Sequence, residues 1–241
     1  MDCHNSWFAR RIRPLSWGID SLRERSLAIC SKEIINKQAE TTRYSIRALR
    51  YWWLRCALLD EISKKEAVTV ADIGSSSGHF KQFFGEMASV KWMAFDRKID
   101  QQHLRGLGYE ECVECDLDET LPCPSDSVDV VVFSHVVEHL LRPECAISEI
   151  ARILRPGGVL LAGSPVLPFP FSRIREWQHR RRYRKGKVEH GGHINSMDSS
   201  RWKSLTRSAN LHPEMIHGTY FLRWSGNPLE NFKWWIRINT D

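Results

Sequence analysis

From Ala67 to Val166, short apolar runs alternate with stretches of helical spacing, and this pattern constrains the fold more than any other feature. The runs are rich in β-branched residues and lack polar alternation, which is typical of strands buried on both faces. In order they are AVTVADI, VKWMAFD, EECVECD, SVDVVVFS and GGVLLAGSPV. Strand alternating with helix predicts a doubly wound α/β fold with a mostly parallel sheet.

The remaining segments of this domain are predicted from the same periodicities. One helix is expected through Phe83 and Met87, and another over PECAISEIARIL. After Val166 a proline-bounded, basic and aromatic stretch predicts a long insertion at about residues 167–197. A helix near Asp198 to Ala209 should follow. Two late apolar runs, MIHGTYFLRW and NFKWWIRIN, would complete a seven-stranded sheet.

The N-terminal part differs from the strand-rich domain. The segment from Ser31 to Lys65 has no glycine or proline, and its apolar residues recur at mostly helical spacing. This predicts one long helix, or two helices joined near Thr41. Residues 1–66 are therefore interpreted as a helical extension that packs on a domain at residues 67–241.

The charge is distributed unevenly along the chain. Residues 1–66 carry a net +5, residues 67–166 a net −7 and residues 167–241 a net +8. The basic flanks would attract an anionic partner. The N-terminus lacks the apolar stretch of a secretory signal, and the odd number of scattered cysteines indicates reduced thiols. A cytoplasmic protein is expected, with peripheral contact at the inner face of the membrane as an open alternative.

The glycine loop VADIGSSSGHF does not fit either common phosphate-binding pattern. A nucleoside-triphosphate loop needs a lysine and a longer spacing than Gly74 to Gly78 provides. A dinucleotide fingerprint needs a third glycine where His79 stands, and a bulky side chain there would separate helix from sheet. The ligand of this loop should therefore lack phosphates.

Three aspartates follow the ends of three predicted strands. Asp72 precedes the glycine loop, Asp96 ends the second strand and Asp116 follows the third. A carboxylate at the second position can accept both hydroxyls of a ribose, and one at the third can reach an adenine amino group. Charged acceptors make the stronger hydrogen bonds to such donors. This pattern predicts a pocket for an adenosine without phosphates.

Four motifs in order resemble the class I S-adenosylmethionine-dependent methyltransferases, in the branch with the type 11 domain. They are VADIGSSSG, AFD, CDLDETLPCPSDSVDVVVFSHVVEHL and EIARILRPGGVLLAGSPV, and together they cover about residues 66–165. The resemblance implies a Rossmann-like fold, S-adenosylmethionine as cofactor and S-adenosylhomocysteine as product. Ser76 stands where the family more often has glycine, and Cys123 and Val128 replace aromatic residues.

The resemblance also implies residue roles. The loop residues would hold the methionine end of the cofactor, Asp96 the ribose, and Asp116 with Leu117 the adenine, while Ser134 would line the fourth strand near the sulfonium. The cofactor-binding residues implied are Asp72, Ile73, Gly74, Ser75, Ser76, Gly78, Asp96, Arg97, Asp116, Leu117 and Ser134.

Two histidines after the fourth strand are the catalytic candidates. His135 and His139 lie one helical turn apart, and imidazole is a suitable base at neutral pH. A base is needed only for an acceptor that loses a proton, so both residues could instead shape the pocket. No metal site is expected, because Cys112 and Cys115 have no second pair. By the same resemblance, His193 is assigned to the substrate lid.

The basic insertion bears on the methyl acceptor. Eight basic residues lie between Arg173 and Lys187, interleaved with Trp177 and Tyr183. An anionic small molecule or a glycan-type or lipid-linked precursor is expected as the acceptor. Nucleic acid is the second choice, since aromatic rings among arginines can stack on bases. A protein that binds the cofactor without catalysis is a further alternative. Tryptophans near both ends of the chain would contact a membrane or pack in the core.

Overall fold

The computed structural model describes residues 46–187, 192–216, 218 and 234. By the density of backbone contacts the chain divides into two compact units: residues 1–60, 79–85 and 217–241, and residues 61–78 and 86–216. The predicted boundaries of the helical extension and of the insertion stay predictions, as does the packing of the extension on the domain.

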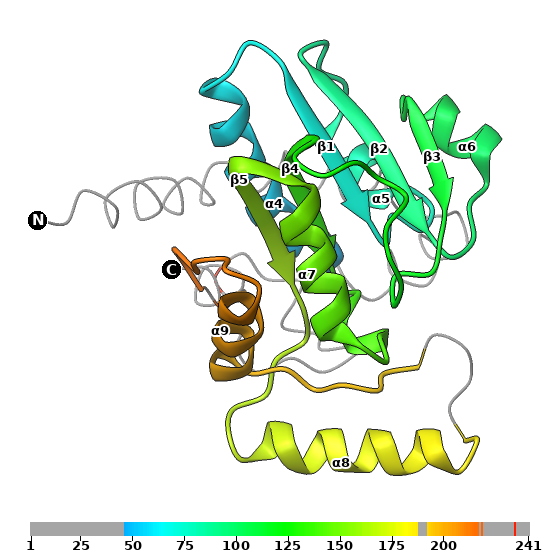
Figure 1. The fold of residues 1–241 in the computed structure, drawn as a ribbon, viewed down its shortest axis with the longest axis vertical. Helices are drawn as coiled ribbons and strands as arrows, with labels where there is room; N and C mark the ends of the chain where they lie inside the picture. Colours follow the sequence, from blue (N-terminus) through cyan, green and yellow to red (C-terminus); the bar gives the residue numbers. More distant parts are fainter. Residues whose placement is uncertain (1–45, 188–191, 217, 219–233, 235–241) are drawn as a thin grey trace, which may run out of the picture. The chain divides into compact units, whose positions relative to one another are not determined.

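The helices and strands, labelled as in Figure 1, are α4 Ile46–Ser63, β1 Val68–Ile73, α5 His79–Phe84, β2 Val90–Asp96, α6 Gln101–Gly106, β3 Glu111–Glu114, β4 Val128–Ser134, the 3₁₀ turn η1 Val137–His139, α7 Pro143–Ile153, β5 Leu154–Gly163, α8 Phe171–Arg184 and α9 Ser199–Ser208. The first part of the predicted N-terminal helix, residues 31–45, lies outside the described residues.

The second unit is built on a parallel sheet with the strand order β3-β2-β1-β4-β5 (Figure 1). The chain winds outward from β1 in both directions, which confirms the doubly wound α/β class. Five strands are described; most of the two late apolar runs lies outside the described residues, so the predicted seven-stranded sheet stays a prediction.

The core of the second unit lies between the sheet and α7. The buried residues of α7 include Ala146, Ile147, Ile150 and Ile153, whose spacing forms one apolar stripe. This stripe joins the same apolar cluster as Val131 and Phe133 of β4 and as α9. Helix α9 begins directly after Asp198, whose carboxylate caps it by accepting the backbone N–H of Arg201.

Two predicted segments differ in the structure. Strand β5 begins at Leu154, three residues before Gly157, because Leu154 already pairs with Val128. An irregular register between Val128 and Val130 accommodates the extra length. The predicted insertion contains a 14-residue helix, α8, that the apolar periodicity did not indicate, because its buried residues are the polar Ser172 and Glu176.

In the first unit, aromatic rings pack between α4 and α5. Tyr51 lies 5.5 Å from Phe80 and 5.8 Å from Phe83 between ring centroids. Trp52 and Trp53 of α4 are buried. Within the described ranges, no helix has both the length and the apolar character needed to cross a membrane.

Candidate functional site

The predicted cofactor residues lie at one edge of the sheet in the second unit. Asp72 is the last residue but one of β1, Asp96 ends β2 and Ser134 ends β4, while Asp116 follows β3. Parallel strands end at the same edge, so the chain brings these four side chains to one side of the sheet. Ligands of open α/β sheets bind at this edge, so the position suits the predicted role.

The glycine loop is fixed to β2 by backbone hydrogen bonds. Gly74 N–H donates to the carbonyl of Phe95 at 2.7 Å, and Gly78 N–H donates to that of Ser75 at 2.8 Å. Gly74 has φ +77°, and a Cβ there would lie 2.2 Å from Cγ2 of Val136. The loop therefore requires glycine at this position for both its conformation and its space.

Asp96 is oriented by the backbone around it. Its Oδ2 accepts the N–H of Ser76 at 2.7 Å, and its Oδ1 accepts the N–H of Arg97 at 2.7 Å. Each carboxylate oxygen has a second lone pair, so the group can accept two further donors. A pair of neighbouring ribose hydroxyls would supply such donors.

Asp116 and Arg97 form an exposed pair beside Asp96. Nη2 of Arg97 lies 3.3 Å from Oδ1 of Asp116, which also accepts the backbone N–H of Asp118 at 3.0 Å. The Asp118 N–H, aided by Arg97, holds the pKa of Asp116 below its usual value against a smaller opposing effect of burial. Asp116 therefore carries its charge at neutral pH, while Leu117 beside it is buried.

Asp72 is buried and shares a hydrogen bond with a tyrosine. The hydroxyl of Tyr109 donates to Oδ2 of Asp72 at 2.5 Å. Burial raises the pKa of Asp72 to about 7, against the lowering effect of the Tyr109 hydroxyl and with a further rise from the charge of Asp96. The sequence analysis did not select Tyr109, because nothing in its local pattern indicates that it reaches the end of β1.

Two serines at this edge have buried hydroxyls without partners. Among the described residues, neither Oγ of Ser75 nor Oγ of Ser134 has a hydrogen-bond partner. A buried hydroxyl left unpaired costs about 1–3 kcal/mol. A polar ligand at the strand ends would remove that cost, so these hydroxyls and the glycine loop fit a nucleoside cofactor with an amino-acid tail.

The two catalytic candidates lie next to this edge. His135 directly follows β4 with φ +59°, an uncommon conformation for a residue other than glycine. Its Nδ1 lies 3.3 Å from Oε1 of Glu138. Nδ1 of His139 lies 3.4 Å from the carbonyl oxygen of Gly192. A carbonyl only accepts, so Nδ1 of His139 is the donor in this contact, which leaves the lone pair of the neutral ring on Nε2.

A segment far along the chain, residues 192–197, is bound to the η1 turn. The backbone N–H of Ile194 donates to the carbonyl of Glu138 at 2.7 Å. The amide of Asn195 donates to the carbonyls of Val137 at 3.0 Å and Leu140 at 2.6 Å. This segment carries His193, whose ring centroid lies 4.9 Å from that of His139. Sequence reasoning did not select Asn195, which holds the segment in place.

Helix α8 is anchored next to this segment by a buried carboxylate. Glu176 accepts from Nε of Arg180 at 2.9 Å and from Nη1 of Arg201 of α9. Nη2 of Arg180 also donates to Oδ1 of Asn195 at 3.0 Å. The predicted basic lid is thus a helix tied through its polar face to the segment that holds His193.

The fold and this edge define a class of protein, the Rossmann-like α/β domains that bind a cofactor beyond their strand ends. A family model described as a methyltransferase domain matches residues 71–162. Over these residues the chain is therefore a class I methyltransferase domain of the type 11 branch, the class for which S-adenosylmethionine is the cofactor. This confirms the resemblance that the four motifs indicate.

Curated relatives agree with this assignment. An uncharacterized methyltransferase of Mycobacterium bovis is 30% identical over 106 residues, which cover 43% of this chain and 41% of that protein. A Mycolicibacterium smegmatis protein, provisionally named an S-adenosylmethionine-dependent methyltransferase, is 53% identical over 45 residues, 19% of this chain and 18% of its own length. The matched stretch thus spans about two fifths of the M. bovis relative.

A solved structure from Bacillus halodurans, provisionally named a methyltransferase, has a TM-score of 0.50 at 22% identity. The match covers 64% of this chain and 67% of that one. At this identity the likeness shows the fold alone, and it extends the agreement beyond the residues that the family model matches.

Proposed function

We propose that this protein transfers a methyl group from S-adenosylmethionine to an oxygen or nitrogen of an anionic small molecule or of a glycan-type or lipid-linked precursor. One observation carries the proposal. Asp72, Asp96 and Asp116 lie at the ends of three neighbouring parallel strands, beside the two buried and unpaired serine hydroxyls. Such a set provides acceptors for an amino group, a ribose and an adenine. The loop between these strands does not have a phosphate-binding pattern.

In this proposal the residues act by binding and positioning. Asp96 binds the ribose, and Asp116 with the Leu117 backbone binds the base. S-adenosylmethionine, when bound, supplies an activated methyl group on a sulfonium. Alignment of the acceptor with that methyl group is the main contribution of the protein. For a hydroxyl acceptor, Nε2 of His139 can accept the proton, because Nδ1 is committed to the Gly192 carbonyl.

The acceptor class is inferred from α8. Five basic side chains of α8 are exposed, namely Arg173, Arg175, Arg181, Arg182 and Arg184. Arg180 is instead paired with Glu176. Phe171, at 62% exposure, and Trp177, at 60%, add apolar surface to the same helix. Positive charge beside apolar surface suits an anionic acceptor with an apolar part.

The same helix also supports nucleic acid as a second candidate acceptor. The guanidinium of Arg181 lies 5.3 Å from the ring centroid of Trp177. Exposed rings beside arginines provide stacking and charge for single-stranded RNA. A labelled-methyl assay with this protein and separate small-molecule, lipid and RNA fractions distinguishes the two candidates. Binding of the cofactor with no transfer to any fraction would instead favour a non-catalytic protein.

Asp96→Ala should weaken the binding of S-adenosylmethionine by about 1–3 kcal/mol, the loss expected when a charged acceptor is removed. Isothermal calorimetry of the purified full chain measures this. Asp100→Ala is the matched control, because Asp100 also accepts a backbone N–H, that of His103, but caps α6. Equal binding by Asp96→Ala and the wild type would exclude Asp96 from the site.

Replacing Arg181, Arg182 and Arg184 together by glutamine should raise KM for an anionic acceptor about 3- to 30-fold at low salt, because exposed charges act through screened attraction. The affinity for S-adenosylmethionine should not change. The control replaces Lys203 and Arg207, exposed basic residues of α9, in the same way. If the triple variant keeps the wild-type KM at low salt, α8 does not bind the acceptor.

A further inference from the structure

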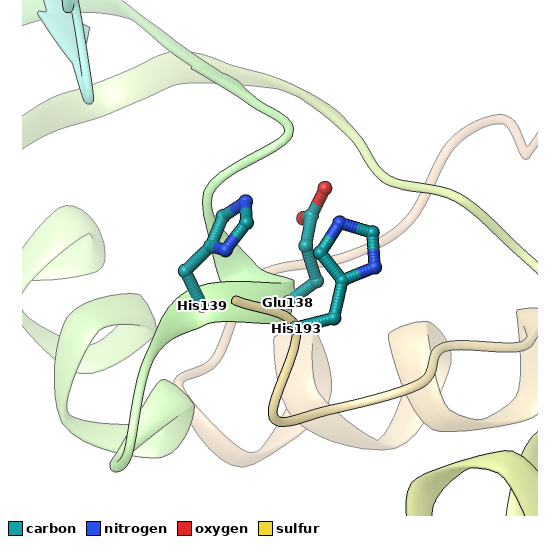
Figure 2. Close-up of side chains that lie close together, drawn as sticks. All are labelled: Glu138, His139 and His193. Atoms are coloured by element: carbon teal, nitrogen blue, oxygen red, sulfur yellow. The ribbon is translucent and has the colours of Figure 1, made fainter. Parts of the chain in front are cut away.

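Glu138, His139 and His193 form a compact cluster of potential metal ligands. One ligand atom from each side chain lies within 4.8 Å of the others. Figure 2 shows the three side chains projecting to the same side, two from η1 and one from the segment at residues 192–197. The sequence analysis expects no metal, and only the tertiary fold brings His193 to this pair.

The Glu138 carboxyl group is buried, and its ion-pair contact among the described residues is with a histidine. Glu138 is 2% exposed, and neither of its carboxylate oxygens accepts a hydrogen bond from the described residues. Nδ1 of His135 lies 3.3 Å from Oε1 without hydrogen-bond geometry, and it is an ionic partner only when its imidazole is protonated. A buried carboxylate is stable only when it is paired, protonated or bound to a cation.

The imidazole of His139 is positioned as a metal-ligating histidine usually is. His139 directs Nδ1 at the Gly192 carbonyl, at 3.4 Å, which leaves the lone pair on Nε2. Histidine ligands commonly donate their other ring N–H to a backbone carbonyl in this way. The backbone hydrogen bonds from Ile194 and Asn195 to Glu138 fix the residues that follow His193. Backbone hydrogen bonds, and not only contacts among the three side chains, therefore hold the cluster together.

We propose that Glu138, His139 and His193 bind one divalent first-row transition-metal ion. Two imidazole nitrogens and one carboxylate suit Zn²⁺ or Fe²⁺, whereas Mg²⁺ and Ca²⁺ prefer oxygen ligands. Three protein ligands leave at least one position for an oxygen atom from outside the chain. If the proposed methyl transfer is correct, an oxygen of the acceptor occupies that position, and the bound ion would favour loss of its proton in place of the base role of Nε2 of His139. The metal site itself does not depend on methyl transfer.

Calorimetric titration of Zn²⁺ into the chelator-treated full chain tests the site, and the absorption of bound Co²⁺ reports its coordination. One ion per chain should bind, and His193→Ala and Glu138→Gln should each weaken binding at least tenfold. His179→Ala is the matched control, since its ring centroid lies 5.9 Å from that of His193 but outside the cluster. Mg²⁺ at the same concentration should not compete.

Three results would overturn the proposal: no stoichiometric binding, variants that bind as tightly as the wild type, or loss of binding on replacing Cys112 and Cys115 by serine. Far-UV circular dichroism and S-adenosylmethionine binding show that each variant is folded. These readouts also separate the two proposals. A protein that binds Zn²⁺ through the cluster but transfers no methyl group refutes the proposed function alone.

Discussion

Gly74→Ala is expected to lower the free energy of unfolding by about 2–4 kcal/mol, as a left-handed backbone penalty and an overpacking penalty act together. The residue has φ +77°, and the new Cβ would lie 2.2 Å from Cγ2 of the buried Val136. The loop can relieve the overlap only by moving from β2 or by displacing Val136. Urea denaturation of the purified protein measures the change.

Gly157→Ala separates the two causes. Gly157 has φ +76°, but nothing lies within 4 Å of its would-be Cβ, so only the backbone penalty of about 1–2 kcal/mol should remain. In a Val136→Ala background, the loss of unfolding free energy caused by Gly74→Ala should fall to a similar value. Equal losses at the two glycines in the wild-type background would show that the contact with Val136 does not constrain the loop.

The stability of the ligand-free protein relative to Asp72→Asn should fall as the pH rises from 5 to 7. The pKa of Asp72 is raised from 3.8 to about 7 by burial, so the folded state holds the proton more tightly than the unfolded state. The contribution of this proton to stability is fully present below the pKa of Asp72 in the unfolded state. It is lost as the pH rises through the pKa of Asp72 in the folded state. The difference in unfolding free energy between the two proteins should change by up to about 1.4 kcal/mol per pH unit. Denaturant unfolding of both proteins across this range measures it.

Tyr109→Phe provides the control for this titration. The Tyr109 hydroxyl lowers the pKa of Asp72, so its removal should move the loss of stability to higher pH. If Asp72 also faces the amino group of S-adenosylmethionine, its proton is released on binding and affinity should increase between pH 6 and 7.5. If the difference in unfolding free energy between wild type and Asp72→Asn does not vary with pH, Asp72 is already ionised at pH 5.

The positions of the strands and their acids were predictable because they depend on local pattern. Val130 to Phe133 forms an uninterrupted apolar run, and the structure buries all four residues. Asp96 and Ser134 end their strands, and parallel strands place such residues at one edge whatever the rest of the chain does. The cofactor class follows from this arrangement.

Helix α8 shows why periodicity alone was insufficient beyond the core. Its buried side of Ser172 and Glu176 is polar, and it is held by Asp198 and Arg201 from a later segment. The spacing of apolar residues identifies helices that bury an apolar stripe. A helix that is anchored by ion pairs lacks this spacing and is not identified.

By itself the sequence determined the parallel sheet, the glycine loop and the acids at the strand ends, since each depends on residues close together in the chain. Only the tertiary structure decided that Tyr109 reaches Asp72 and that His193 joins Glu138 and His139. These contacts join residues 37 positions apart or more, and the backbone hydrogen bonds that position them depend on the completed fold. For that reason the cofactor class could be inferred before the structure, and the candidate metal cluster could not.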